Sequence, residues 1–392
     1  MKKYDFDRVI PRRGTGSLKY DFALARAGRE DLLPLWVADM DFALPQEILQ
    51  KIHERTDHGI FGYTEPDEAY GDTLKSWFYR HYGWEIDPKW NTVVPGVVFA
   101  IAVAVQAYTK PGEAVLIQEP VYYPFRGTIE SNQRICVNNE LREINGHYEI
   151  DFDDFERRIR ENDVKLFLLC NPHNPVGRVW KKKELERIAA ICDRYGVTVV
   201  SDEIHCDFIY RGYEFTSYAS LGEASLKNTV ICTSPSKTFN IAGLQVANIL
   251  IPNRKLRSAF RRQVDANGYS QVNALGLTAA KAVYDLGEEW LSELLVYLQE
   301  NLEFFREYLK KNLPDLRLIE PEGTYLLWVD FSKAVNNEQD LVKLIRDRAH
   351  LWLDEGSVFS KEAPLYERFN IACPRSIVEQ ALEQLKEAVY GV

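Results

Sequence analysis

Short apolar runs alternate with helical patterns through the middle of the chain. Four runs are apolar at most positions and each gives way to polar residues: 114–120, 164–172, 197–203 and 229–234. Between the second and third runs, residues 182–196 carry an apolar stripe at helical spacing that closes at Gly196. Strands that are apolar on both faces and separated by helices predict a parallel sheet covered by helices on each side.

The last third of the chain has a different pattern. Residues 254–313 are almost continuously helical, with weak breaks at Gly268 and Gly287, until Pro314 ends the helix. Beyond it the pattern predicts, in order, a strand pair at 316–331, a helix at 338–350 and a last helix from about Ser376. We therefore expect an α/β protein in which a smaller α+β domain follows a large one.

No internal repeat or low-complexity linker divides the 392 residues. We expect residues 1–45 to form an N-terminal arm that packs with the small domain. Residues 46–285 are expected to form the large domain, and residues 286–392 the small one.

Composition narrows the function classes. A net charge of −10 argues against a general nucleic-acid binder, because phosphate binding needs a positive field. No apolar stretch approaches the roughly 20 residues of a membrane span, and the first residues lack the apolar core of a signal peptide. The six cysteines are scattered without C-x-x-C pairs, so a reducing cytoplasm is the simplest location.

Polar residues that could take part in catalysis or binding follow three of the predicted strands. Asn171 and Asn174 lie in "CNPHNPVG" after the second run, and Asp202 closes the third in "SDEIH". Lys237 follows the fourth run in "SPSK". A lone lysine is ordinarily a solvated surface charge. However, ligands of open α/β sheets bind beyond the carboxyl ends of the strands, so we expect these side chains at one rim.

Two further features of this rim suit an anion. Residues 93–108 pass from an apolar run through Pro-Gly into a helical pattern, which leaves backbone N–H groups free at the start of a helix. Ser234 and Ser236 add hydroxyl groups beside Lys237.

Pyridoxal phosphate needs this combination of groups. Its phosphate suits a helix N-terminus and hydroxyls, its aldehyde a lysine amine, its pyridine nitrogen a carboxylate, and its 3′ oxygen a neutral donor. A metal site is the alternative for the acids, histidine and cysteine at positions 202–207. Consecutive residues on an extended chain point to opposite sides, so no metal is expected there.

Seven motifs together resemble a known family. They are "FDRVIPRRGTGSLKYD", "LPLWVADMDF", "GYTEP", "NPHNPVGRVW", "SDEIHCDF", "SKTFNIAGLQ" and "RFNIACPR", and they span nearly the whole chain. The chain resembles a fold-type-I pyridoxal-phosphate enzyme of the aspartate-aminotransferase superfamily. More narrowly, it is similar to the MalY/PatB-type carbon–sulfur lyases, the cystathionine β-lyases.

The resemblance implies a role for each matching residue. Lys237 is the lysine that bonds the cofactor aldehyde, Asp202 pairs with the pyridine nitrogen, and Asn174 donates to the 3′ oxygen with His205 nearby. Tyr122 stacks on the ring, with Tyr123 as the substitute if the match is shifted by one residue. The remaining residues are the phosphate ligands Val97, Val98 and Ser234, the cross-subunit phosphate ligand Tyr63, and the substrate-carboxylate clamp Arg368.

One departure from the wider superfamily favours the lyase branch. Aminotransferases usually carry a phosphate-binding arginine eight residues after the lysine, and this chain has Gln245. We therefore expect α,β-elimination of L-cystathionine or related S-substituted cysteines to pyruvate, ammonia and a thiol. The alternatives are an aminotransferase and a protein with an additional regulatory, protein-binding role.

The resemblance also implies a homodimer with composite sites, since Tyr63 would reach the partner subunit. Arg12 and Arg13 belong to a structural arm or contact the substrate, and the sequence leaves both readings open.

Overall fold

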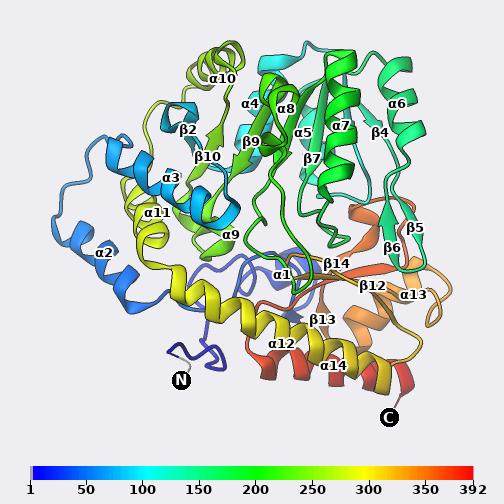
Figure 1. Ribbon diagram of the computed structural model, residues 1–392. Helices are drawn as coiled ribbons and strands as arrows, with labels where there is room; N and C mark the ends of the chain where they lie inside the picture. The colour runs from blue at the N-terminus through cyan, green and yellow to red at the C-terminus, as the bar shows by residue number, and fades with distance from the viewer. Residues whose placement is uncertain (1–2, 392) are drawn as a thin grey trace.

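The computed structural model describes residues 3–391, in which a large sheet lies above a smaller one (Figure 1). The large sheet has seven strands, in spatial order β2 (Asn91–Val94), β10 (Ala247–Leu250), β9 (Thr229–Thr233), β8 (Thr198–Asp202), β7 (Leu166–Cys170), β3 (Ala114–Ile117) and β4 (Ile135–Asn138). Only β10 runs antiparallel to its neighbours. The mostly parallel sheet is therefore confirmed.

The four predicted strands are β3, β7, β8 and β9, and all four are fully or almost fully buried. The pattern did not predict β4 and β10. Each has only four residues. β3 is equally short, but all four of its residues are apolar, whereas β4 ends in Asn138 and β10 contains Asn248, which weakens the strand pattern.

Alternation along the strands divides the core into two layers. In β7, Leu166, Leu168 and Cys170 pack with α4 (Val97–Tyr108), α5 (Pro124–Ser131) and α10 (Arg254–Ala266) on one face. Phe167 and Leu169 point to the other face, toward α6 (Phe152–Glu161) and α7 (Lys182–Tyr195). Because both faces are covered, the strands are apolar at successive positions.

The smaller sheet is antiparallel, in the order β11 (Arg317–Ile319), β12 (Leu326–Asp330), β15 (Tyr366–Asn370) and β14 (Asp354–Glu355). The predicted strand pair is β11 and β12. The predicted helix at 338–350 begins as α13 (Glu338–Val342) and continues in π-helical form over Lys343–Arg348. The last helix, α14 (Arg375–Tyr390), lies beside α12 (Glu288–Asn312), which crosses the lower part of Figure 1.

The helical region before Pro314 is less continuous than the pattern predicted. A non-helical segment separates α10 from α11 (Ala274–Leu286), and only Gly287 separates α11 from α12. Gly268 takes a positive φ of 78°, and the Asn273 side chain accepts from the N–H groups of Leu275 and Gly276. A left-handed residue and a capped helix start make this break a true loop.

The N-terminal residues run between the two sheets. After α1 (Ala23–Ala27), strand β1 (Leu33–Pro34) pairs with β13 (Leu351–Trp352). The rings of Trp36 and Trp352 stack with their centroids 4.5 Å apart. The chain then continues into α2 (Gln46–Asp57) and α3 (Glu68–Tyr82), which lie with α11 at the left of Figure 1. Among residues 3–391, no helix is long and apolar enough to cross a bilayer.

A buried ion pair joins the turn after β7 to the smaller sheet. Arg178 Nε donates to Glu322 Oε2 at 2.9 Å, and both side chains are less than 5% exposed. Glu322 also accepts from the backbone N–H of Val179 at 2.8 Å. The turn that carries Asn171 and Asn174 is thereby fixed against the second domain.

Removing one member of this pair is expected to destabilise the fold. Glu322→Ala leaves the buried guanidinium of Arg178 with Glu184 as its carboxylate, so we expect the free energy of unfolding to fall by about 3–5 kcal/mol. The matched control is Glu320→Ala, whose Arg306 pair lies at the surface and is expected to contribute at most about 1 kcal/mol. Urea unfolding measures both, and equal losses would contradict the assignment.

Candidate active site

Lys237 lies in a single helical turn at the carboxyl end of β9. The turn is α9 (Pro235–Thr238), and Ser234 caps it by accepting from the N–H of Ser236 at 3.0 Å. Lys237 is partly buried, and its Nζ donates to the carbonyl oxygen of Ala38 at 2.6 Å. Tyr325 donates to the same oxygen at 3.0 Å. The amine is thus held at one defined point rather than solvated.

Burial also sets the charge of this amine. It lowers the pKa of Lys237 from 10.5 to about 8, since a cation loses its hydration there. The carboxylate of Asp39 opposes the shift, the guanidinium of Arg368 adds to it, and Asp202 opposes it. A neutral amine is therefore accessible close to physiological pH.

Lys237 borders a cavity of about 250 Å³ between the strand ends of the large sheet and the smaller sheet. All the predicted site residues except Tyr63 line it: Val97, Val98, Tyr122, Asn174, Asp202, His205, Ser234, Lys237 and Arg368. These residues come from six separate segments of the chain. The structure therefore brings together the groups that the sequence placed at one rim.

Asp202 ends β8 and faces the cavity with its carboxyl group. Its Oδ1 accepts from the N–H of Ile204 at 3.1 Å. Burial raises the pKa of Asp202 to about 7, while this N–H and the charge of Lys237 act in the opposite direction. A buried carboxyl group with this little compensation suits a cationic partner in the cavity.

His205 and Asn174 supply neutral polar groups. His205 is buried against the Tyr325 ring, its Nδ1 has no hydrogen-bond partner, and burial lowers its pKa well below 6.5. The imidazole is therefore neutral. Asn174 Oδ1 accepts from Arg368 at 2.9 Å, which leaves its NH₂ group to donate elsewhere.

Arg368 is paired before any substrate arrives. It lies on β15, forms an ion pair with Asp354 of β14, and donates to the carbonyl oxygen of Trp36 at 2.7 Å. Its Nε is buried and has no partner. Arg368, predicted to clamp the substrate carboxylate, lines the cavity, and any carboxylate bound there would have to share it with Asp354.

The anion-binding features meet at the start of α4. The first helical bond joins the N–H of Ala100 to the carbonyl oxygen of Gly96, so the N–H groups of the first turn are free of helical partners. Ser234 Oγ donates to Val246 O at 2.6 Å, so its proton is already committed. Ser236, which the sequence placed at this rim without a role, lines the cavity too.

Two tyrosines close one side of the cavity. Tyr122 packs against Phe125, and Tyr123, which is 41% exposed, packs against Phe359. Both line the cavity, so the assignment of ring stacking to Tyr122 with Tyr123 as the alternative stays a prediction.

Tyr63 lies outside this cavity and is 94% exposed. It lines a separate hollow with Gln245, and Pro95 lines both spaces. Gln245 takes a positive φ of 55° at the end of a short turn. No chain segment between residues 3 and 391 covers the Tyr63 ring, which is the geometry expected of a group that acts outside its own subunit.

The expectation that residues 202–207 form an extended chain, on which no metal site could be built, is wrong in its premise. A turn begins there, because β8 ends at Asp202. The side chains nevertheless diverge. Glu203 accepts from Ser201 and from the N–H of Tyr218, whereas Asp207 accepts from Tyr82 and Thr238.

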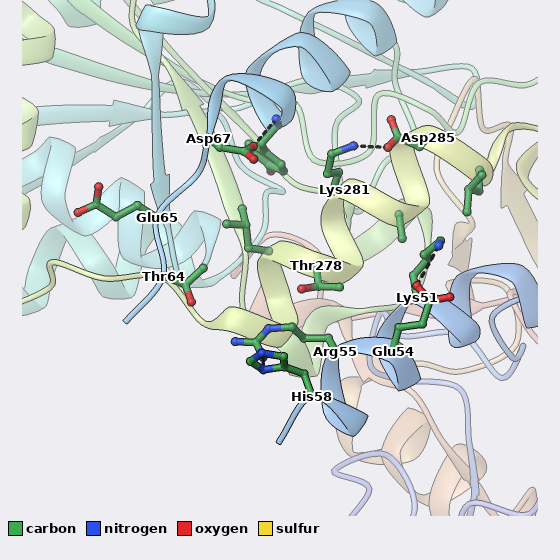
Figure 2. Close-up of a pocket in the computed structure, with 14 residues that line it drawn as sticks. Lys51, Glu54, Arg55, His58, Thr64, Glu65, Asp67, Thr278, Lys281 and Asp285 are labelled. Atoms are coloured by element: carbon green, nitrogen blue, oxygen red, sulfur yellow. Dashed lines mark hydrogen bonds and ion pairs between the residues drawn. The ribbon is translucent and has the colours of Figure 1, made fainter. Parts of the chain in front are cut away.

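A larger hollow, of about 680 Å³, lies between α2, the start of α3 and α11 (Figure 2). Both lysines that line it form ion pairs, Lys51 with Glu54 and Lys281 with Asp285. Asp67 caps α3 by accepting from the N–H of Tyr70. This hollow therefore lacks the free amine and the buried acid of the smaller cavity.

The groups that line the cavity fit pyridoxal phosphate. An unpartnered histidine nitrogen, a buried acid, the free N–H groups of a helix start and a lysine amine face one space of aromatic-ring size. The sequence missed Asp354 and the carbonyl oxygen of Ala38, because neither residue type signals a role without its contacts.

Known proteins resemble the chain over its whole length. A family model described as aminotransferase class I and II matches residues 30–385. Cystathionine beta-lyase PatB of Bacillus subtilis (strain 168) is 40% identical over 385 residues, which cover 98% of this chain and 100% of that protein. Protein MalY of Escherichia coli (strain K12) is 31% identical over 391 residues, with 99% and 100% coverage.

A solved structure agrees with them. The crystal structure of cystalysin from Treponema denticola, which contains a pyridoxal 5′-phosphate cofactor, is similar with a TM-score of 0.96 and 37% identity. The match covers 99% of each chain.

The pKa of Lys237 can be measured in the cofactor-free protein. After ¹³C reductive methylation, we expect the Lys237 resonance, assigned by its absence in Lys237→Arg, to titrate near pH 8 rather than 10.5. Asp39→Asn should lower the midpoint because it removes a stabilising anion, and Arg368→Gln should raise it because it removes a competing cation. A wild-type midpoint above pH 10, or a higher midpoint in Asp39→Asn together with a lower one in Arg368→Gln, would contradict this assignment.

Proposed function

This chain belongs to the class I and II aminotransferase family, and we propose that it is a pyridoxal-5′-phosphate-dependent carbon–sulfur β-lyase. Its substrates are L-cystathionine or related S-substituted cysteines, and its products are pyruvate, ammonia and a thiol. The observation that carries the proposal is the full-length match to cystathionine beta-lyase PatB, supported by the convergence of Lys237, Asp202, Asn174 and Arg368 on one cavity.

Each edge of the cofactor has a complementary group in the cavity. Lys237 would hold its aldehyde carbon, Asp202 its pyridine nitrogen, and Asn174 with His205 its 3′ oxygen. The first turn of α4 at Val97 and Val98, with Ser236, would hold the phosphate, and Ser234 would join them once its hydroxyl turns away from Val246 O. When bound, pyridoxal phosphate supplies an electron sink for a carbanion at the substrate Cα.

Lys237 is the base that moves the Cα proton in this proposal. A pKa near 8 leaves a useful fraction of the amine neutral at physiological pH, so that it can accept a proton. Ala38 O lies 2.6 Å from Nζ and is an acceptor for the ammonium that results. Burial of the site keeps water from competing for the same proton.

Arg368 and Asn174 orient the substrate. Arg368 lines the cavity, so its guanidinium would bind the α-carboxylate there, and charge-assisted bonds of this kind are strong. Burial raises the pKa of Asp354, so this carboxyl group can take up a proton more readily than usual. Protonation would release Arg368 from Asp354 when the second carboxylate arrives.

The leaving group separates a lyase from an aminotransferase. Both reactions share the removal of the Cα proton, but a thiolate at Cβ leaves readily and ends the reaction as elimination. Gln245 also replaces the arginine expected beside the phosphate in aminotransferases, and it lies in the hollow of Tyr63 rather than in the cavity. These points favour elimination.

We further propose a homodimer in which Tyr63 completes the partner's site. The segment around it carries three exposed large apolar side chains, Ile60, Phe61 and Tyr63, at 57–94% exposure. Such a cluster is typical of an interface rather than of free surface. Pro95 connects this hollow with the cofactor cavity, so a partner's segment placed there would lie close to α4.

Product stoichiometry tests the lyase assignment. With L-cystathionine and no added keto acid, we expect pyruvate, ammonia and thiol in equal amounts over many turnovers. Lys237→Ala should lose turnover, because no other described side chain in the cavity can take its place as the covalent amine. Product formation that stalls after one turnover and resumes with a keto acid would instead identify an aminotransferase.

Subunit mixing tests the composite site. Tyr63→Ala and Lys237→Ala homodimers should each be impaired, whereas a mixed dimer has one site that is wild type at both positions. We expect the mixture to regain part of the wild-type activity, up to about a quarter after random exchange of equal amounts, because half of the dimers are mixed. Absence of rescue, with exchange verified by differently tagged subunits, or a monomer in sedimentation, would contradict the dimer.

A further inference from the structure

A second cavity meets the first at Lys237. It has a volume of about 560 Å³ and shares Val37, Ala38, Lys237 and Ala242 with the cofactor cavity. Arg368 lines only the inner cavity, whereas Arg12 and Asp39 line only the outer one. A ligand clamped by Arg368 and reacting at Lys237 therefore has room to extend toward Arg12.

The outer cavity has an apolar wall interrupted by one reachable ion pair. Arg12 donates from its NH2 group to Asp39 Oδ2 at 2.7 Å, and both side chains are about a quarter exposed, at 22% and 24%. The neighbouring pair, Lys19 and Asp41, is buried at 0% and 5%. Arg12 and Asp39 are therefore the more exposed pair; Asp41 also lines the cavity, but its carboxylate is already bonded to Arg12 and Lys19.

Arg12 is oriented but not saturated. Its NH1 group donates to Met40 O at 3.1 Å and to Asp41 Oδ1 at 2.8 Å, and its guanidinium lies over the Tyr20 ring. These bonds and the one to Asp39 use three of the five N–H donors of a guanidinium. Nε and one NH2 hydrogen remain for a carboxylate.

Asp39 supplies the opposite charge. Its Oδ2 accepts one bond from Arg12 and can accept a second from a ligand ammonium group. Its Oδ1 is buried, 3.9 Å from Lys19 Nζ. A wall whose most exposed ion pair is one cation and one anion matches a zwitterion, since a ligand with only one charge meets repulsion from one member of that pair.

We infer that Arg12 and Asp39 recognise an α-amino-acid zwitterion at the far end of the sulfur substituent. The inference rests on the proposed function, because it assigns the second end of a substrate whose first end Arg368 holds. It also decides the reading of the arm: Arg12 reaches substrate space, whereas Arg13 bonds to the carbonyl oxygens of Tyr20 and Glu30 and does not line the cavity.

Four thioethers of matched length test the inference. They are L-cystathionine, S-(3-carboxypropyl)-L-cysteine, S-(3-aminopropyl)-L-cysteine and S-propyl-L-cysteine, which differ only in the charges on the third carbon beyond sulfur. The readout is kcat/KM for each relative to S-propyl-L-cysteine. A change that alters kcat/KM equally for all four substrates leaves this ratio unchanged. The influence of Asp39 on the pKa of Lys237 is a change of that kind.

We expect Arg12→Gln to lower the ratio about tenfold to a hundredfold for the two carboxylate-bearing substrates, as for loss of a bond to a charged group. Asp39→Asn should lower it for the two ammonium-bearing substrates. The matched control, Arg13→Gln, should leave all ratios unchanged. An equal loss on all four substrates in Arg12→Gln would assign Arg12 a purely structural role and overturn the inference.

A binding measurement separates failure of this inference from failure of the lyase assignment. L,L-2,7-Diaminosuberate carries a methylene group in place of the sulfur of L-cystathionine and cannot release a thiol. Its Kd by calorimetry should rise about tenfold or more in Arg12→Gln and not in Arg13→Gln, even if the wild type cleaves none of the thioethers. A Kd that does not respond to Arg12→Gln would overturn the inference whatever the lyase assay shows.

Discussion

The hydrogen bond from Lys237 to the carbonyl oxygen of Ala38 is the contact on which the site depends. It fixes a partly buried amine, whose pKa is lowered to about 8, against a segment between the two sheets. The same carbonyl oxygen accepts from Tyr325, next to β12 of the smaller sheet. One acceptor thus joins the reactive lysine, the N-terminal arm and the second domain.

The backbone of the arm accepts hydrogen bonds from side chains on both sides of it. Arg368 donates to Trp36 O, Asn370 to Val37 O and Asp39 O, and Asn240 to Met40 O. Since these donors come from both domains, the position of residues 36–40 is set by the domains together. The two cavities on either side of Ala38 are therefore shaped by the same segment.

Charge is balanced locally around this segment. Arg368 is paired with Asp354 and Arg12 with Asp39, so each guanidinium is oriented before a substrate binds. A pre-oriented cation loses little conformational entropy on binding, but the ligand must share it with a resident carboxylate. Such a site favours ligands that bring charges of both signs.

The sequence alone predicted the architecture and the residue types at the strand ends. Apolar runs and helical stripes are local patterns, and the carboxyl ends of parallel strands meet at one edge, so Asp202, Ser234 and Lys237 could be grouped without coordinates. The resemblance added Arg368, which no periodicity places near the others. The short strands β4 and β10 were missed because each four-residue run includes an asparagine, unlike the equally short but wholly apolar β3.

Only the tertiary structure decided which charges face which cavity. The Arg368–Asp354 and Arg12–Asp39 pairs depend on strand register and on the path of the arm, and neither is encoded in a local window. The sequence also left Arg12 and Arg13 equivalent as neighbours. The fold separates them, because the chain direction at the arm turns one guanidinium into the outer cavity and the other toward backbone carbonyls at the surface.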